Sequence, residues 1–140
     1  DNNEVVGVGS SRRRSRSDDS HMPRPRAVET EIKHLKTMPD AGTFPEWRRS
    51  FYLNAIAASG RGEQCSQWLH ETNVRGANPD DFVVVTPKWQ SFDAKLAIAI
   101  SAIARGPLAA RIPRAVDEAL SHGGVATGRS MLCMLFRHFE

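Results

Sequence analysis

The clearest hydrophobic pattern in the chain lies in residues 86–105, which read TPKWQSFDAKLAIAISAIAR. Its large apolar residues recur at spacings of three and four, which is typical of one face of an α-helix. They are Trp89, Phe92, Leu96, Ile100 and Ile103. Thr86 is a good N-cap, Pro87 suits the first helical turn, and Gly106 ends the pattern. We therefore predict a central helix against which other helices pack.

Two helices are predicted before it. The first opens at Thr43 or Pro45 and ends at the glycines of residues 59–62. Its apolar face holds Phe44, Trp47, Phe51, Ala55 and Ala58. The second covers residues 63–72, with Cys65, Trp68 and Leu69 facing inward. Residues 73–81 are a predicted loop. The β-prone run 82–85 has no partner strand, so we expect an extended or single-turn lead into the central helix.

Two more helices are predicted after it. Leu108, Ile112, Val116 and Leu120 lie four residues apart, but Pro113 interrupts them. We therefore expect a turn followed by a helix over residues 114–121. Thr127 caps a last helix over residues 128–139. Its inward residues are Met131, Leu132, Leu135, Phe136 and Phe139. The sequence thus predicts an all-α domain over residues 44–140, a small bundle of about five helices joined by short loops.

Residues 1–43 have the composition of a disordered arm, rich in Ser, Arg, Asp and Pro. Six arginines against two aspartates give the stretch 12–26 a net charge of +4. The arginines are Arg12, Arg13, Arg14, Arg16, Arg24 and Arg26. The arm is either a nucleic-acid-binding or nuclear-targeting segment or a solvated tail. A short helix over residues 27–38, through Val28, Ile32 and Leu35, is also predicted.

Composition limits the setting of the protein. The chain has 140 residues and a formal net charge of +3, and no apolar run is long enough to span a membrane. Two cysteines cannot form a disulfide framework, so we expect a reducing, cytoplasmic setting, with a nuclear one as the alternative. The chain lacks an initiator Met, and its apolar pattern runs to the last residue. We therefore expect it to be part of a longer protein.

Catalytic and metal-binding motifs are not found. Cys65 and His70 have the C-x4-H spacing of a zinc knuckle, but Gly62 and Arg75 occupy the other two ligand positions. Two ligands cannot close a tetrahedral zinc site. No nucleophile, zinc-protease or phosphate-loop motif occurs. We expect no enzyme, no cofactor and no small-molecule substrate.

One alternative is a helical nucleic-acid-binding module that uses the basic arm and the last helix. A helix-turn-helix over residues 114–140 would present Arg129, Ser130, Arg137 and His138. However, residues 44–140 hold eleven basic and nine acidic side chains, a net charge of only +2. That balance is typical of a solvated surface rather than of a dedicated duplex-binding face.

Five short segments carry a resemblance to a known family. They are Phe44-Pro45-Glu46-Trp47-Arg48, Trp68-Leu69, Phe92-Asp93-Ala94-Lys95-Leu96-Ala97, Gly128-Arg129-Ser130-Met131-Leu132 and His138-Phe139. In this order they resemble the Gag-like capsid region of copia-type LTR retrotransposons, in the divergent copies found in protists such as dinoflagellates. The resemblance covers residues 44–140. Two features of such proteins are absent, namely the zinc knuckle and the major homology motif of retroviral capsids.

The resemblance implies a structural protein that self-associates and packages the RNA of a transposable element. RNA binding, without sequence specificity, would then fall to the arm. We predict that the core and assembly positions are Trp47, Phe51, Trp68, Trp89, Phe92, Leu96, Ile100, Leu132 and Phe136. Ile56 and Ile98 lie off the main apolar stripes. They either line a broader core or form a contact between subunits.

Overall fold

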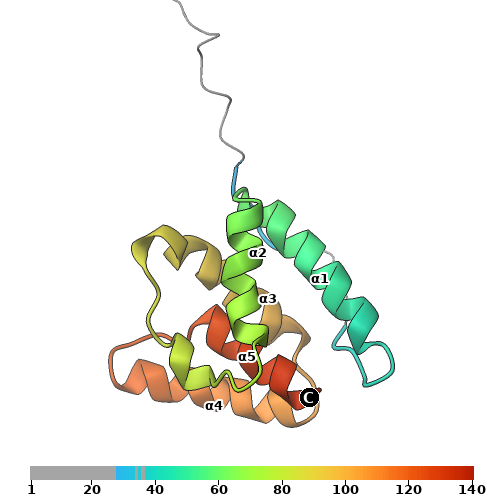
Figure 1. Ribbon diagram of the computed structural model, residues 1–140. Helices are drawn as coiled ribbons and strands as arrows, with labels where there is room; N and C mark the ends of the chain where they lie inside the picture. Colours follow the sequence, from blue (N-terminus) through green and yellow to red (C-terminus); the bar gives the residue numbers. More distant parts are fainter. Residues whose placement is uncertain (1–27, 34, 36) are drawn as a thin grey trace, which may run out of the picture.

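The computed structural model describes residues 28–33, 35 and 37–140, and it is all-α (Figure 1). Its α-helices are α1 (Phe44–Ser59), α2 (Glu63–His70), α3 (Gln90–Ile103), α4 (Pro107–Ser121) and α5 (Gly128–His138). Short 3₁₀ helices are η1 (Glu71–Asn73), η2 (Pro79–Phe82) and η3 (Pro87–Trp89). No strand occurs in the described part of the chain. The predicted bundle of about five helices is confirmed.

The helix pair α3 and α5 forms the centre of the fold. α5 packs most extensively against α3 and also contacts η1, η2 and α4. Gly128 lies where the two helices meet. A Cβ atom at this position would lie 2.4 Å from the Asp93 carbonyl oxygen and 2.7 Å from Leu96 Cβ. Only glycine therefore allows α5 to begin this close to α3.

One large hydrophobic core joins the helices. Eight of the nine predicted core positions are buried, from Phe51 in α1 to Phe136 in α5. The ninth, Trp47, is half-buried and stacks on Phe51, with 5.2 Å between the ring centroids. These side chains are enclosed by the domain itself, so they form its core.

The segment before α1 differs from the prediction. Residues 28–33 contain no helix, so the predicted short helix through Val28 and Ile32 is wrong there. Instead, the Thr30 N–H donates to the Ala58 carbonyl (2.8 Å), and the Ile32 side chain is buried in the core. Packing thus begins well before residue 43. We call residues 28–33 the strap. Residues 1–27, with the six arginines of the arm, lie outside the described residues.

α4 also differs from the prediction, because it continues through Pro113. A proline inside a helix removes one backbone hydrogen bond and costs about 3 kcal/mol. Leu108 and Ile112 are buried on the preceding turns, and Val116 packs against the core on the following one. Burial on both sides of Pro113 holds the helix together, which local propensity does not reveal.

The central helix begins later than predicted. Residues 87–89 form η3, and the Trp89 N–H donates to the Thr86 carbonyl (2.9 Å), so α3 starts at Gln90. The Thr86 side chain makes no capping bond. In the predicted loop, Asn78 and Asp81 form a capping box that starts η2. Both differences arise at element ends, where short 3₁₀ turns are frequent.

We predict that Gly128→Ala lowers the free energy of unfolding by about 3 kcal/mol, because the added methyl group forces α3 and α5 apart. Gly124→Ala is the matched control. Its Cβ would lie 3.5 Å from the Ala119 carbonyl oxygen, an ordinary contact. We expect a change below about 0.5 kcal/mol there. Urea unfolding followed by circular dichroism checks both, and equal effects would contradict the close helix crossing.

Candidate functional site

A buried carboxylate joins α3 to the beginning of α5. Asp93 is only 4% exposed. Its two oxygens accept hydrogen bonds from the N–H groups of Gly128 (2.7 Å) and Arg129 (3.0 Å). Burial raises the pKa of Asp93, while these two donors and the nearby guanidinium of Arg129 oppose that shift. The first turn of α5 is therefore bound within the protein and is not free to receive an external anion.

Aromatic and cationic side chains stack into a column beside this junction. Trp68 and Trp89 stack with 4.5 Å between ring centroids. The guanidinium of Arg129 lies 4.8 Å from the Trp68 ring and 4.9 Å from the Phe82 ring. Arg61 lies 4.8 Å from the Trp89 ring. The column links α2, α5, η2 and η3, so these cations stabilise the fold.

Both arginines of the last helix bond to other parts of the protein. Arg129 also donates to the Trp68 carbonyl (3.2 Å) and pairs with Glu71. Arg137 donates to the Ala77 carbonyl. His138 is exposed and Ser130 half-buried. The four residues of the helix-turn-helix alternative therefore do not form one cationic surface.

An apolar groove lies between α3, α4 and the loop before α5. It encloses about 500 Å³, and its walls hold Ala97, Ile98, Ser101, Ala102, Val116, Leu120, Val125, Ala126 and Met131. Three of these are large and strongly exposed: Ile98 at 70%, Leu120 at 59% and Val125 at 70%. Ala97, Val116 and Met131 are partly or fully buried and form the floor. We call this surface the α3–α4 groove.

The sequence left open whether Ile56 and Ile98 line a broader core or form a contact between subunits, and their exposure bears on this choice. Ile98 does not line a broader core, whereas Ile56 is half-buried and packs against the core. Leu120 continues the four-residue spacing of Leu108, Ile112 and Val116, but it is exposed. An α-helix turns 100° per residue, so a spacing of four drifts by about 40° each time. After three such steps Leu120 points away from the core and towards the groove.

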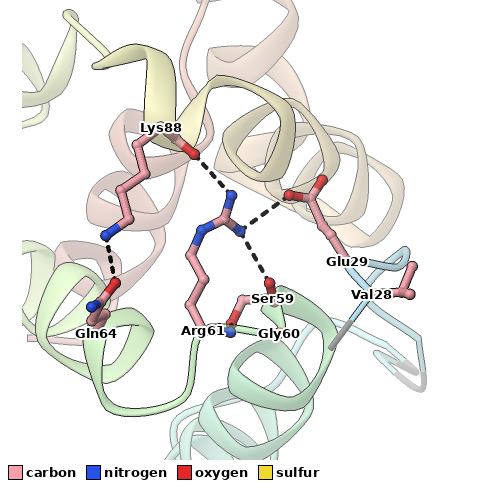
Figure 2. A pocket seen from close by; sticks show the side chains of 7 residues that line it. All are labelled: Val28, Glu29, Ser59, Gly60, Arg61, Gln64 and Lys88. Carbon is pink, nitrogen blue, oxygen red and sulfur yellow. Dashed lines mark hydrogen bonds and ion pairs between the residues drawn. The ribbon is translucent and has the colours of Figure 1, made fainter. Parts of the chain in front are cut away.

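A basic pocket lies at the opposite end of α1 from Phe44 (Figure 2). It encloses about 820 Å³ and is lined by Val28, Glu29, Ser59, Gly60, Arg61, Gln64 and Lys88. The Glu29 carboxylate accepts from Arg61 (3.1 Å), Ser91 (2.6 Å) and Lys95 (2.5 Å). No sequence pattern indicates this cluster, because its members come from four separate segments.

Both cysteines are free thiols buried inside the domain. Cys65 is fully buried, and burial raises the pKa of its thiol; the same holds for Cys133. His70 is exposed on the end of α2. Over residues 28–33, 35 and 37–140, no group of three or more potential metal ligands is present.

Comparison with known proteins adds no family. No protein-family model, curated protein or solved structure matches this chain. Among the described helices, none is long and apolar enough to cross a membrane.

We predict that Glu29 makes stability depend on acid pH. Burial disfavours its charge, but the bonds from Lys95, Ser91 and Arg61 outweigh this and lower its pKa from 4.5 to about 2. A carboxyl group whose pKa is lower in the folded state stabilises the protein at pH values above its unfolded pKa. That stabilisation is lost as the pH falls through the folded pKa. Glu29→Gln should cost about 1 kcal/mol at pH 7. The loss in the free energy of unfolding caused by Glu29→Gln should become smaller as the pH falls from 4.5 to 2.

Urea unfolding of both proteins at pH 7, 4 and 2.5 checks this prediction. Glu31→Gln is the control, because Glu31 is exposed on the same strap and makes no recorded side-chain bond among the described residues. Its effect should stay near zero throughout. A Glu29→Gln difference that is the same at every pH would contradict the ion-pair account.

Proposed function

We propose that this chain is a capsid-type structural domain of a retroelement Gag protein. In this proposal it self-associates through the α3–α4 groove and helps to package the element's RNA through its basic arm. The observation that carries the proposal is the groove itself, where the large apolar side chains of Ile98, Leu120 and Val125 are exposed to solvent. Contiguous apolar surface of this kind usually marks a binding site.

The shape of the groove favours a second copy of the chain as its occupant. Ile98 protrudes from α3 next to a floor of smaller or buried side chains, including Ala97 and Ala126. A protruding apolar group and a recess on the same face are self-complementary about a twofold axis. The low net charge of +2 over residues 44–140 leaves little repulsion between copies.

The RNA part of the proposal depends on the arm. Its six arginines supply cations for the phosphate backbone without reading sequence. Replacing all six by glutamine in the full chain should abolish most RNA binding and flatten its salt dependence. Affinity that survives this change would favour the alternative, a dedicated nucleic-acid-binding module. The internal bonds of Arg129 and Arg137 weigh against the last helix as the binding element of such a module.

We predict that Ile98→Asp weakens self-association at least tenfold while the monomer stays folded. The substitution places a charge in the proposed contact but removes no core side chain, since Ile98 is 70% exposed. Leu53→Asp is the matched control. Leu53 is 66% exposed on α1 and does not line the groove.

Sedimentation velocity of the full chain over a concentration series measures both variants. The wild type and Leu53→Asp should show the same concentration-dependent growth, and Ile98→Asp should remain smaller. A wild-type chain that is monomeric at every concentration would contradict the proposal. So would loss of association in the α1 variant alone.

A further inference from the structure

Three cations from different segments lie at the basic pocket: Arg61 and Lys88 line it, and Lys95 bonds Glu29 in its wall. Arg61 lies between α1 and α2, Lys88 in η3, and Lys95 in α3. Figure 2 shows the Arg61 guanidinium between the Lys88 carbonyl, to which it donates (2.8 Å), and the Glu29 carboxylate. Its stacking on Trp89 further fixes its plane. The guanidinium is thus held in place before any ligand arrives.

Glu29 neutralises this cluster only in part. The carboxylate pairs with Arg61 and Lys95, and Lys88 adds a third cation to the pocket wall, which leaves an excess of positive charge. The Lys88 ammonium bonds the uncharged amide oxygen of Gln64 (2.5 Å). Within the described residues it has no acidic partner. Space remains beside these groups, because the pocket encloses about 820 Å³. The site has both charge and room for an anion.

The bonds that hold Glu29 are those that hold a phosphate group. Guanidinium, ammonium and hydroxyl donors bind carboxylate and phosphate oxygens in the same way, and arginine does so with a fixed fork of donors. Here these donors come from Arg61, Lys95 and Ser91, all within 3.1 Å of the carboxylate oxygens. Glu29 therefore occupies the position that an external phosphate oxygen would take.

We propose that this pocket binds a phosphate group of an RNA backbone, with Glu29 as its competitor within the chain. The inference deepens the RNA-packaging part of the proposed function and rests on it. Arg26, the last arginine of the arm, precedes Glu29 by only three residues in the sequence. An RNA strand held by the arm is consequently brought to the mouth of the pocket.

The strap allows this exchange without unfolding the domain. Ile32 is buried in the core, and the Thr30 N–H is bonded to Ala58. Val28, on the arm side of Glu29, is 77% exposed. The Glu29 side chain can therefore leave the pocket while Ile32 keeps the strap anchored.

The test measures the affinity of the full chain for a ten-nucleotide oligouridine RNA at fixed salt. Glu29→Gln should raise the affinity about five- to tenfold, because it releases the competing carboxylate. Glu31→Gln removes the same charge two residues away and should change the affinity less than about twofold. Adding Lys88→Gln to Glu29→Gln should cancel the gain. Thermal unfolding of each variant confirms that it is folded.

Inorganic phosphate provides the second arm of the test. It should shift the indole signal of Trp89 in the NMR spectrum of Glu29→Gln, and less so in the wild type. Equal effects of Glu29→Gln and Glu31→Gln on RNA affinity would overturn the inference. A gain that survives Lys88→Gln would overturn it too. Phosphate binding without any effect of Glu29 on RNA affinity would overturn the assignment to RNA.

These outcomes are separate from those that test the proposed function. The six-arginine replacement measures the contribution of the arm with Glu29 intact. Sedimentation measures the groove, which shares no residue with the pocket. RNA binding through the arm that does not respond to Glu29 would therefore reject the pocket alone. Loss of self-association would leave the pocket untouched.

Discussion

The fold depends on the junction between the Asp93 carboxylate and the beginning of α5. A buried carboxylate is costly unless its oxygens are bonded, and the N–H groups of Gly128 and Arg129 meet that need. The bonds in turn require a backbone approach that only glycine at 128 permits. Arg129 then reaches Trp68, whose ring stacks on Trp89. One junction thereby fixes the positions of α2, α3 and α5.

Because many polar side chains are bonded within the domain, only some of its surfaces are free to bind a partner. The residues that carry the resemblance to Gag-like capsid regions, such as Asp93, Gly128 and Arg129, make hydrogen bonds inside the domain. The last helix is consequently a structural element. Two surfaces remain available for binding. The α3–α4 groove exposes large apolar side chains, and the basic pocket has an excess of positive charge. The first favours a second copy of the chain and the second favours an anion, and the proposed function requires both.

The sequence predicted the helices well because each has a long apolar stripe with a clear end, as in α5 from Thr127 onward. It failed where tertiary packing overrides local preference, as at Pro113, which burial of Ile112 and its neighbours keeps helical. The sequence indicated only one of the exposed residues of the α3–α4 groove. Ile98 lies off its stripe, whereas the four-residue spacing of Leu120 with Leu108, Ile112 and Val116 does not indicate that Leu120 is exposed. The basic pocket was not predictable, since its residues share no spacing.

The most direct test of the account follows the exposed methyl groups of the unmodified full chain by NMR over a concentration series. Isoleucine, leucine and valine methyl signals report each exposed apolar side chain separately. The account predicts that Ile98, Leu120 and Val125 shift or broaden as concentration rises, while Leu53 and Val84 do not. Concentration-independent signals in the groove would contradict it, as would changes centred on Leu53. Either result would remove the groove as the site of assembly.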